Sequence, residues 1–159
     1  MLLIGKGTQA ALDMYRCLED VICDKERIKD IMESAADRFN LKELALYSTE
    51  NEDGDDYCFI MLCTCGHIFL HIFPSYGYVG GDIFILDGSC NPEAAATYLR
   101  KEFDPDQAKV TTLIRGDADI KDMKPRRKKN IKTIRKAKNA GAKLKKLVLN
   151  QKKEAQQEL

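Results

Sequence analysis

The middle of the chain constrains the fold most, because its apolar residues recur at the spacing of β-strands. Gly66 interrupts this pattern, and Ser75–Gly81 has the composition of a turn or bulge. The segments between these breaks predict three strands, Tyr57–Cys63, His67–Phe73 and Asp82–Leu86.

Helices and further strands are expected on both sides of this region. Asp24 is a suitable N-cap for a helix that ends near Phe39, and Asn91 followed by Pro92 opens a second helix, which ends near Phe103. The remaining segments expected to be strand-like or apolar are residues 7–17, Lys42–Ser48 and Val110–Ile114. This order predicts an α+β fold, a two-layer sandwich of an antiparallel sheet with helices on one face.

The charge is divided sharply along the sequence. Residues 1–116 carry 20 acidic and 11 basic residues, a net charge of −9, whereas residues 117–159 carry 15 basic and 5 acidic residues, a net charge of +10. We therefore expect a domain over residues 1–116 and a basic, helical C-terminal extension over residues 117–159.

The cysteines and the absence of long apolar runs indicate a reduced, cytoplasmic protein. No segment has the length of a membrane helix, and the apolar start lacks the basic leader of a signal peptide. We expect free and mostly buried thiols at Cys17, Cys23, Cys58, Cys63, Cys65 and Cys90.

The segment from His67 to Phe84 resembles the centre of the prokaryotic S-adenosylmethionine decarboxylases, and the resemblance covers about residues 5–116. The matching positions are His71, Pro74, Tyr76, Gly77, Tyr78, Asp82 and Phe84. The resemblance implies a family that cleaves its own chain at a serine and converts that serine into a pyruvoyl group, which then acts as an electron sink for decarboxylation.

Several positions depart from the family pattern. Gly66 stands where the family has the self-cleaving serine, and Cys65 replaces the preceding glutamate. Leu86 replaces the proton-donating cysteine, and Ser75 replaces the acid that contacts the substrate ribose. Glycine supplies neither nucleophile nor leaving group, so no pyruvoyl cofactor is expected at residue 66.

His71 and Cys65 are the candidate catalytic residues that remain. The resemblance assigns His71 a role in self-cleavage, and the Cys65 thiol could undergo a similar acyl shift one residue away. A metal site is an alternative, because Cys63, Cys65, His67 and His71 share odd positions on a strand. We expect core thiols and no metal there, because alternate strand residues lie about 7 Å apart.

The candidate ligand-binding residues lie at and after the end of the expected strand His67–Phe73. They are Phe73, Ser75, Tyr76 and Tyr78. A nucleoside or an amine is the expected ligand, with Phe73 available to stack on a ring. Carboxylates at Asp13, Asp53, Asp55 and Asp56 could attract polyamines, but we expect them to be solvated.

Pro125 could begin a helix in the basic extension, where Ile134, Ala137, Leu144 and Val148 form a loose heptad. The extension contains no aromatic residue, so nucleic acid would be bound through phosphates without base stacking. An interaction helix, nucleic-acid binding and no defined role all remain open.

These observations predict a non-catalytic binding or regulatory homologue linked to polyamine (spermidine) metabolism. A homodimer, or a heterodimer with a related decarboxylase, is expected because two subunits of the family pack into a larger sheet sandwich. The alternatives are a decarboxylase with altered processing at Cys65 and a nucleic-acid-associated protein. No membrane partner is expected.

Overall fold

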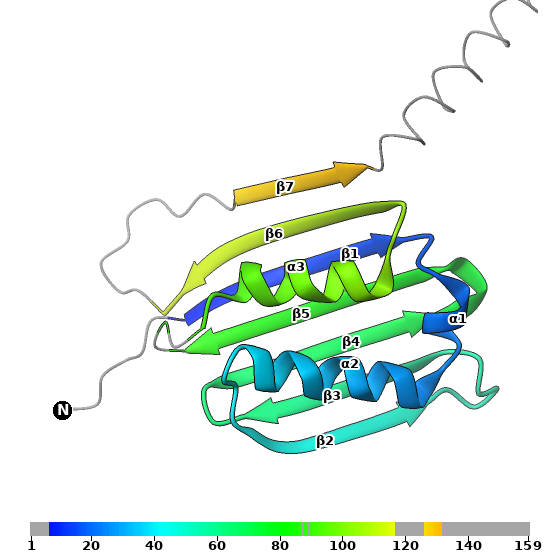
Figure 1. Cartoon of the computed structure of the whole chain (residues 1–159), viewed down its shortest axis with the longest axis horizontal. Coiled ribbons are helices and arrows are strands. Elements are labelled where there is room, and N and C mark those ends of the chain that lie inside the picture. The colour runs from blue at the N-terminus through cyan, green and yellow to red at the C-terminus, as the bar shows by residue number, and fades with distance from the viewer. Residues whose placement is uncertain (1–6, 87, 89, 117–125, 132–159) are drawn as a thin grey trace, which may run out of the picture.

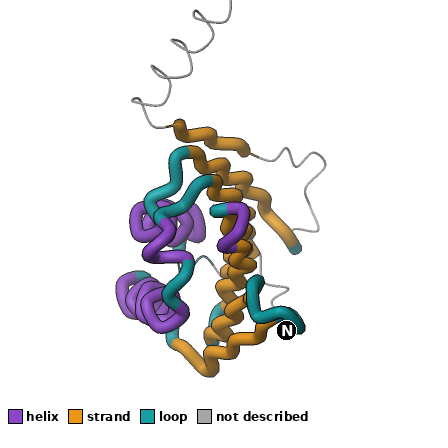
Figure 2. Tube along the Cα trace, turned by 90° about the vertical axis from the view of Figure 1, so that its right-hand side faces the viewer, coloured by secondary structure: helices purple, strands orange, loops and turns teal. Residues whose placement is uncertain are grey.

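A computed structural model of the chain describes residues 7–86, 88, 90–116 and 126–131. One antiparallel sheet of seven strands carries the helices on one face (Figures 1 and 2). The strands are β1 (Gly7–Tyr15), β2 (Glu43–Glu50), β3 (Tyr57–Cys63), β4 (Gly66–Phe73), β5 (Tyr78–Leu86), β6 (Gln107–Arg115) and β7 (Arg126–Ile131), in the spatial order β2-β3-β4-β5-β1-β6-β7. The predicted α+β sandwich is confirmed.

The helices are α1 (Glu19–Ile22), α2 (Lys25–Arg38) and α3 (Pro92–Phe103). The Asp24 side chain accepts a hydrogen bond from the Arg27 amide, and Asn91 accepts one from the Glu93 amide, as their N-cap assignments predicted. The four-residue helix α1 was not predicted. None of the helices in the described part of the chain is long and apolar enough to cross a bilayer.

The core lies between the helices and one face of the sheet. Alternate strand residues such as Leu12, Leu70 and Ile83 are almost completely buried there, against Met32 of α2 and Phe103 of α3. Over the opposite face of the sheet, called the open face below, lies none of the helices α1, α2 and α3 of the described residues (Figure 2). Because strand side chains alternate, the sequence pattern of each strand determines which residues reach the open face.

Two expected turns differ from the structure. The interruption at Gly66 is a reversal of the chain, because Thr64 and Cys65 form a two-residue turn between the antiparallel strands β3 and β4. The turn expected over Ser75–Gly81 is shorter: a 3₁₀ turn over Pro74–Tyr76 is followed by left-handed Gly77. The second half of the expected turn belongs to β5, which pairs with both β1 and β4.

The sheet also continues beyond the boundary expected near Gly116. Strand β7 pairs with β6 from Thr112↔Arg126 to Gln107↔Ile131, so these residues form a strand and not the expected start of a helix. The remaining predictions for the basic extension fall outside the described residues: the helix start at Pro125 lies in 117–125, and the heptad lies in 132–159.

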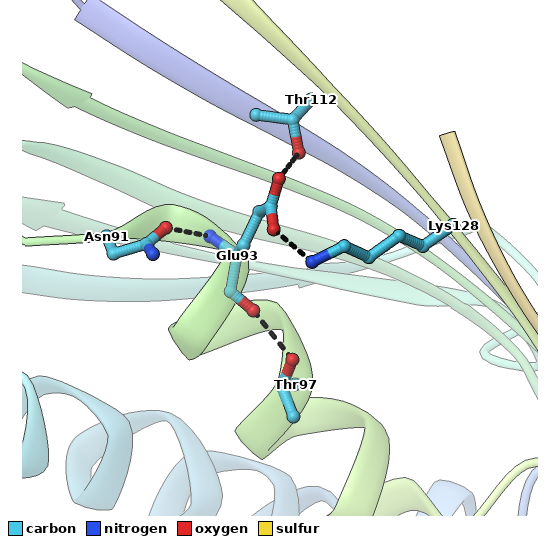
Figure 3. Close-up of polar contacts among 5 residues, drawn as sticks. All are labelled: Asn91, Glu93, Thr97, Thr112 and Lys128. Carbon is cyan, nitrogen blue, oxygen red and sulfur yellow. Dashed lines mark hydrogen bonds and ion pairs between the residues drawn. The ribbon is translucent and has the colours of Figure 1, made fainter. Parts of the chain in front are cut away.

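Glu93 links β7 to the rest of the fold (Figure 3). Its carboxylate lies in the first turn of α3, accepts a hydrogen bond from the Thr112 hydroxyl at 3.0 Å and forms an ion pair with Lys128 of β7. One carboxylate therefore contacts two neighbouring strands. This contact and the backbone pairing satisfy groups at the edge of the sheet that would otherwise be exposed.

Candidate functional site

The open face carries a row of ring contacts that runs along β4 and crosses to β5 and β1. The Phe69 and His71 rings meet edge to face with centroids 4.4 Å apart, and His71 and Phe73 stack at 6.1 Å. Tyr78 continues the row, with its ring centroid 5.8 Å from that of Phe73 and 5.1 Å from that of Tyr15. His71, a predicted catalytic residue, thus lies between Phe69 and Phe73 in this row.

Gly66 lies at the start of β4, opposite Ile85 of β5, and has no space for a side chain. A Cβ atom added to Gly66 would lie 1.8 Å from the carbonyl oxygen of Phe84 and 2.8 Å from its carbonyl carbon. Both are backbone atoms of a paired strand, so a rotamer change cannot relieve the contact. The residues present do not fit a serine-derived pyruvoyl group at this position.

The carbonyl group before Gly66 is also held in place. The amide of Leu86 donates a 2.7 Å hydrogen bond to the carbonyl oxygen of Cys65. In a chain with a serine at residue 66, this carbonyl is the one that the hydroxyl would attack. The carbonyl group of Cys65 is therefore fixed by a hydrogen bond, although residue 66 carries no nucleophile that could attack it.

The two candidate catalytic residues lie on different sides of the sheet. Cys65 is partly buried in the β3–β4 turn and packs against the core, whereas the exposed His71 belongs to the open face. The pKa of Cys63 is raised to about 11, mainly by burial and to a smaller extent by the neighbouring Cys65. The same two causes raise the pKa of Cys90. The structure does not bring Cys65 and His71 together.

An aromatic cavity of about 430 Å³ lies at one end of the row and is lined by Tyr15, Phe73, Tyr76 and Tyr78. Three of these residues are predicted ligand-binding residues, but Ser75 is not part of the lining. Tyr15 was missed, although it becomes evident once β1 is aligned with β5, because it is paired with Tyr78.

Tyr78 is anchored below the aromatic cavity by Asp13. Its hydroxyl donates a 2.9 Å hydrogen bond to the Asp13 carboxylate, which also lies 3.5 Å from the ammonium nitrogen of Lys109. Burial, and then this hydrogen bond, raise the pKa of Tyr78 to about 12. The hydrogen bond to Asp13 holds the Tyr78 ring as one wall of the cavity.

A second, smaller cavity of about 180 Å³ lies where β2, β3 and β4 meet the acidic loop that follows β2. It is lined by Thr49, Glu50, Asn51, Asp56, Tyr57, Cys58, His71 and Phe73. Cys58 was missed as a site residue, because its proximity to His71 depends on the pairing of β3 with β4.

A polar chain crosses the open face near the Gly66 end. Gln9 donates a 2.8 Å hydrogen bond to Asp82 and accepts one of 3.1 Å from Arg115. The imidazole of His67 lies 3.8 Å from the other oxygen of Asp82. These side chains connect four adjacent strands, from β4 to β6.

The described residues contain no group of three or more histidine, cysteine or acidic side chains that could hold a metal ion. The predicted carboxylates also fall in different places. Asp53 and Asp55 are exposed in the loop, Asp56 reaches the smaller cavity, and Asp13 lies on β1. These four residues do not form one amine site.

Comparison with known proteins shows which family has a sequence similar to this chain. A protein-family model described as S-adenosylmethionine decarboxylase matches residues 8–116. An S-adenosylmethionine decarboxylase proenzyme of Acidithiobacillus ferrooxidans is 27% identical over 118 residues, which cover 72% of this chain and 85% of the relative. The proenzyme of Pyrococcus horikoshii is 29% identical over 114 residues, covering 69% and 78%.

A solved structure gives the same result for the fold. The adenosylmethionine decarboxylase from Aquifex aeolicus VF5 superimposes with a TM-score of 0.61 at 19% identity. The match covers 74% of this chain and 95% of that chain. At this identity, the similarity supports the shared architecture.

Proposed function

Because this chain belongs to the S-adenosylmethionine decarboxylase family, we propose that it is a member that binds a small ligand without making the family's pyruvoyl group. The observation that carries the proposal is Gly66, where an added Cβ would lie 1.8 Å from a backbone oxygen. Glycine provides no β-oxygen for the acyl shift. A ligand-binding homologue in polyamine metabolism fits a chain that keeps the family fold and an aromatic cavity.

Denaturing mass spectrometry of the purified protein tests this proposal. We expect one species at the full-length mass of 18.0 kDa, because the chain does not cleave itself. Treatment with a carbonyl-reactive hydrazine is expected to leave this mass unchanged. The Cys65→Ala variant is the control and is expected to give the same single, uncleaved species.

A decarboxylase that processes itself at Cys65 is the second candidate, favoured by the relatives, which are named proenzymes. This candidate predicts two fragments that separate beside Cys65, a downstream fragment that reacts with the hydrazine, and loss of cleavage in Cys65→Ala. Such a result would overturn the non-processing proposal.

We place the ligand in the aromatic cavity. Its volume of about 430 Å³ is in the range of small-molecule sites, and four aromatic rings offer stacking to a nucleobase and cation–π contact to an amine. The Asp13 carboxylate behind Tyr78 is paired with Lys109, so this wall is polar and its two charges balance. S-adenosylmethionine, which carries both a base and positive charge, and spermidine, which carries charge alone, are the ligands to compare.

Tyr76→Ala is expected to weaken binding of the preferred ligand by about tenfold, because one ring contact of roughly 1 kcal/mol or more is lost. Tyr76 is 78% exposed, so its removal leaves the core intact. Tyr47→Ala is the matched control, because Tyr47 is 62% exposed on β2, outside the cavity lining. Calorimetric titration that shows equal affinities for both variants would place the ligand elsewhere.

We also propose that a second copy packs on the open face. Leu62 is 40% exposed there, and half-buried Ile60 and Phe69 lie beside it. Covering them would remove apolar area from water. Native mass spectrometry is expected to give twice the mass of the chain. The mass of a single chain at micromolar concentration would contradict this proposal. A complex that contains one copy of this chain and one related decarboxylase would identify a heterodimer.

A further inference from the structure

The pairing of β7 with β6 gathers three cations at one edge of the sheet. Val110 of β6 is buried against the core, so its neighbours Lys109 and Thr111 belong to the opposite face. Lys129 is paired with Lys109, and Arg127 is paired with Thr111. Directly opposed residues share one face of a sheet, so Arg127 and Lys129 lie beside Lys109. The side chains of Arg127 and Lys129 are exposed.

The pairing of Lys109 with Lys129 brings two like charges together. Cβ atoms of directly opposed residues are about 4.5–5.5 Å apart, and like charges in such a pair destabilise a sheet. The Asp13 carboxylate, 3.5 Å from the ammonium nitrogen of Lys109, balances one of these charges. In the part of the chain that the structure describes, no carboxylate pairs with Arg127 or Lys129. An anion bound beside these residues would therefore relieve the repulsion.

Lys128, between Arg127 and Lys129 in the sequence, has a different role. Its ammonium group forms an ion pair with Glu93 of α3, on the helix side of the sheet (Figure 3). This ion pair and the backbone pairing with β6 hold β7 in one register. Lys128 therefore anchors the strand, and its two neighbours on the other side are available to a ligand.

The outer edge of β7 lies far from the residues that a second copy is proposed to cover. Those residues, Ile60, Leu62 and Phe69, belong to β3 and β4. Strands β5, β1 and β6 lie between β4 and β7, so four strand spacings, or about 19 Å, separate β4 from β7. β7 is the last strand of the described sheet, and long basic side chains at this edge can extend past it into solvent.

The sequence around β7 favours a polyanion as the ligand. Residues 123–153 contain 14 lysine and arginine residues and no aspartate or glutamate. A nucleic acid carries one negative charge on every nucleotide, so it can neutralise a long series of cations. A protein or a membrane would need an aromatic or apolar surface to contact, and Arg127, Lys128 and Lys129 offer none. Residues 123–153 also contain no aromatic residue.

We propose that Arg127 and Lys129, together with Lys109, bind the phosphate groups of a nucleic acid at the outer edge of β7. Alternate residues of a strand lie about 7 Å apart, so Arg127 and Lys129 can contact separate phosphates of one backbone. The Thr111 hydroxyl belongs to the same face and can donate a hydrogen bond to a phosphate oxygen. Because these contacts reach only the backbone, binding is independent of base sequence and weakens steeply as salt is added.

Fluorescence anisotropy with a labelled DNA duplex of mixed sequence tests this site in the full-length protein. The double variant Arg127→Gln, Lys129→Gln is expected to bind about tenfold more weakly at physiological salt. The slope of log affinity against log salt concentration is expected to fall by about 2, because two phosphate contacts are lost. The variant Arg127→Lys, Lys129→Arg keeps both charges and is expected to bind within about twofold of the unchanged protein.

The matched control is the double variant Lys29→Gln, Lys42→Gln. It removes the same charge from exposed positions on α2 and before β2, at the other edge of the sheet, and is expected to leave the affinity within about twofold. Lys129→Gln is expected to leave the urea midpoint unchanged or slightly higher, because it removes a like-charge pair. No binding by the unchanged protein, equal affinities of the two glutamine double variants, or a preference for one duplex sequence would overturn the proposal. A β7 double variant that aggregates but binds DNA normally would show that these charges only protect the edge of the sheet.

Discussion

Replacing Gly66 with serine is expected to destabilise the fold by about 3 kcal/mol or more, and not to restore self-cleavage. The new Cβ would lie 1.8 Å from the Phe84 carbonyl oxygen, so β4 and β5 must separate locally. That movement weakens the ladder that carries both His71 and Tyr78. Urea unfolding measures the loss of stability, and denaturing mass spectrometry tests for cleavage.

Two variants show whether the Cβ atom is the cause. Gly66→Ala adds the same atom without a hydroxyl and is expected to lose about as much stability as Gly66→Ser. Gly80→Ala is the control on the paired strand, because its Cβ would meet only the Tyr78 side chain, at 3.0 Å from the hydroxyl oxygen. A Gly66→Ser protein that is as stable as the unchanged chain, or that cleaves itself, would show that the backbone adapts to a side chain at this position.

The elements with a strong periodic pattern could be predicted from the sequence. The caps at Asp24 and Asn91 begin helices as expected, and the apolar runs of β3, β4 and β5 form strands. Helix α1 has only four residues, which is too short for a periodic pattern to develop. The basic segment at β7 has no apolar alternation, and only its pairing with the edge of β6 makes it a strand.

The candidate site was predictable where it depends on residue type, and not where it depends on pairing between strands. The aromatic residues from the end of β4 to the start of β5 predicted a ligand site, and Phe73, Tyr76 and Tyr78 do line one cavity. That a ligand binds there stays a prediction. The position of Cys58 opposite His71 follows from the turn at Thr64 and Cys65, which sets the register of β3 on β4. The lack of space at Gly66 depends on the backbone of β5, which no local pattern reveals.

Replacing Phe103 with alanine is expected to cost about 3–5 kcal/mol, because the ring is completely buried and its removal leaves a cavity. Phe103 lies at the end of α3, and its carbonyl oxygen accepts a 3.0 Å hydrogen bond from the Leu18 amide, so the cavity would open where α1, α3 and the sheet meet. Small domains are stable by only about 5–15 kcal/mol, so this variant is expected to unfold at a much lower urea concentration.

Phe69→Ala is the matched control, since it removes the same side chain from the open face of β4. In a single chain this half-buried ring borders solvent, so its loss leaves no closed cavity and is expected to cost about 1 kcal/mol or less. Similar losses for both variants would contradict the view that the core lies only on the helix side. If the loss at Phe69 instead grows with protein concentration, a second copy covers the open face, because only an intermolecular contact depends on concentration.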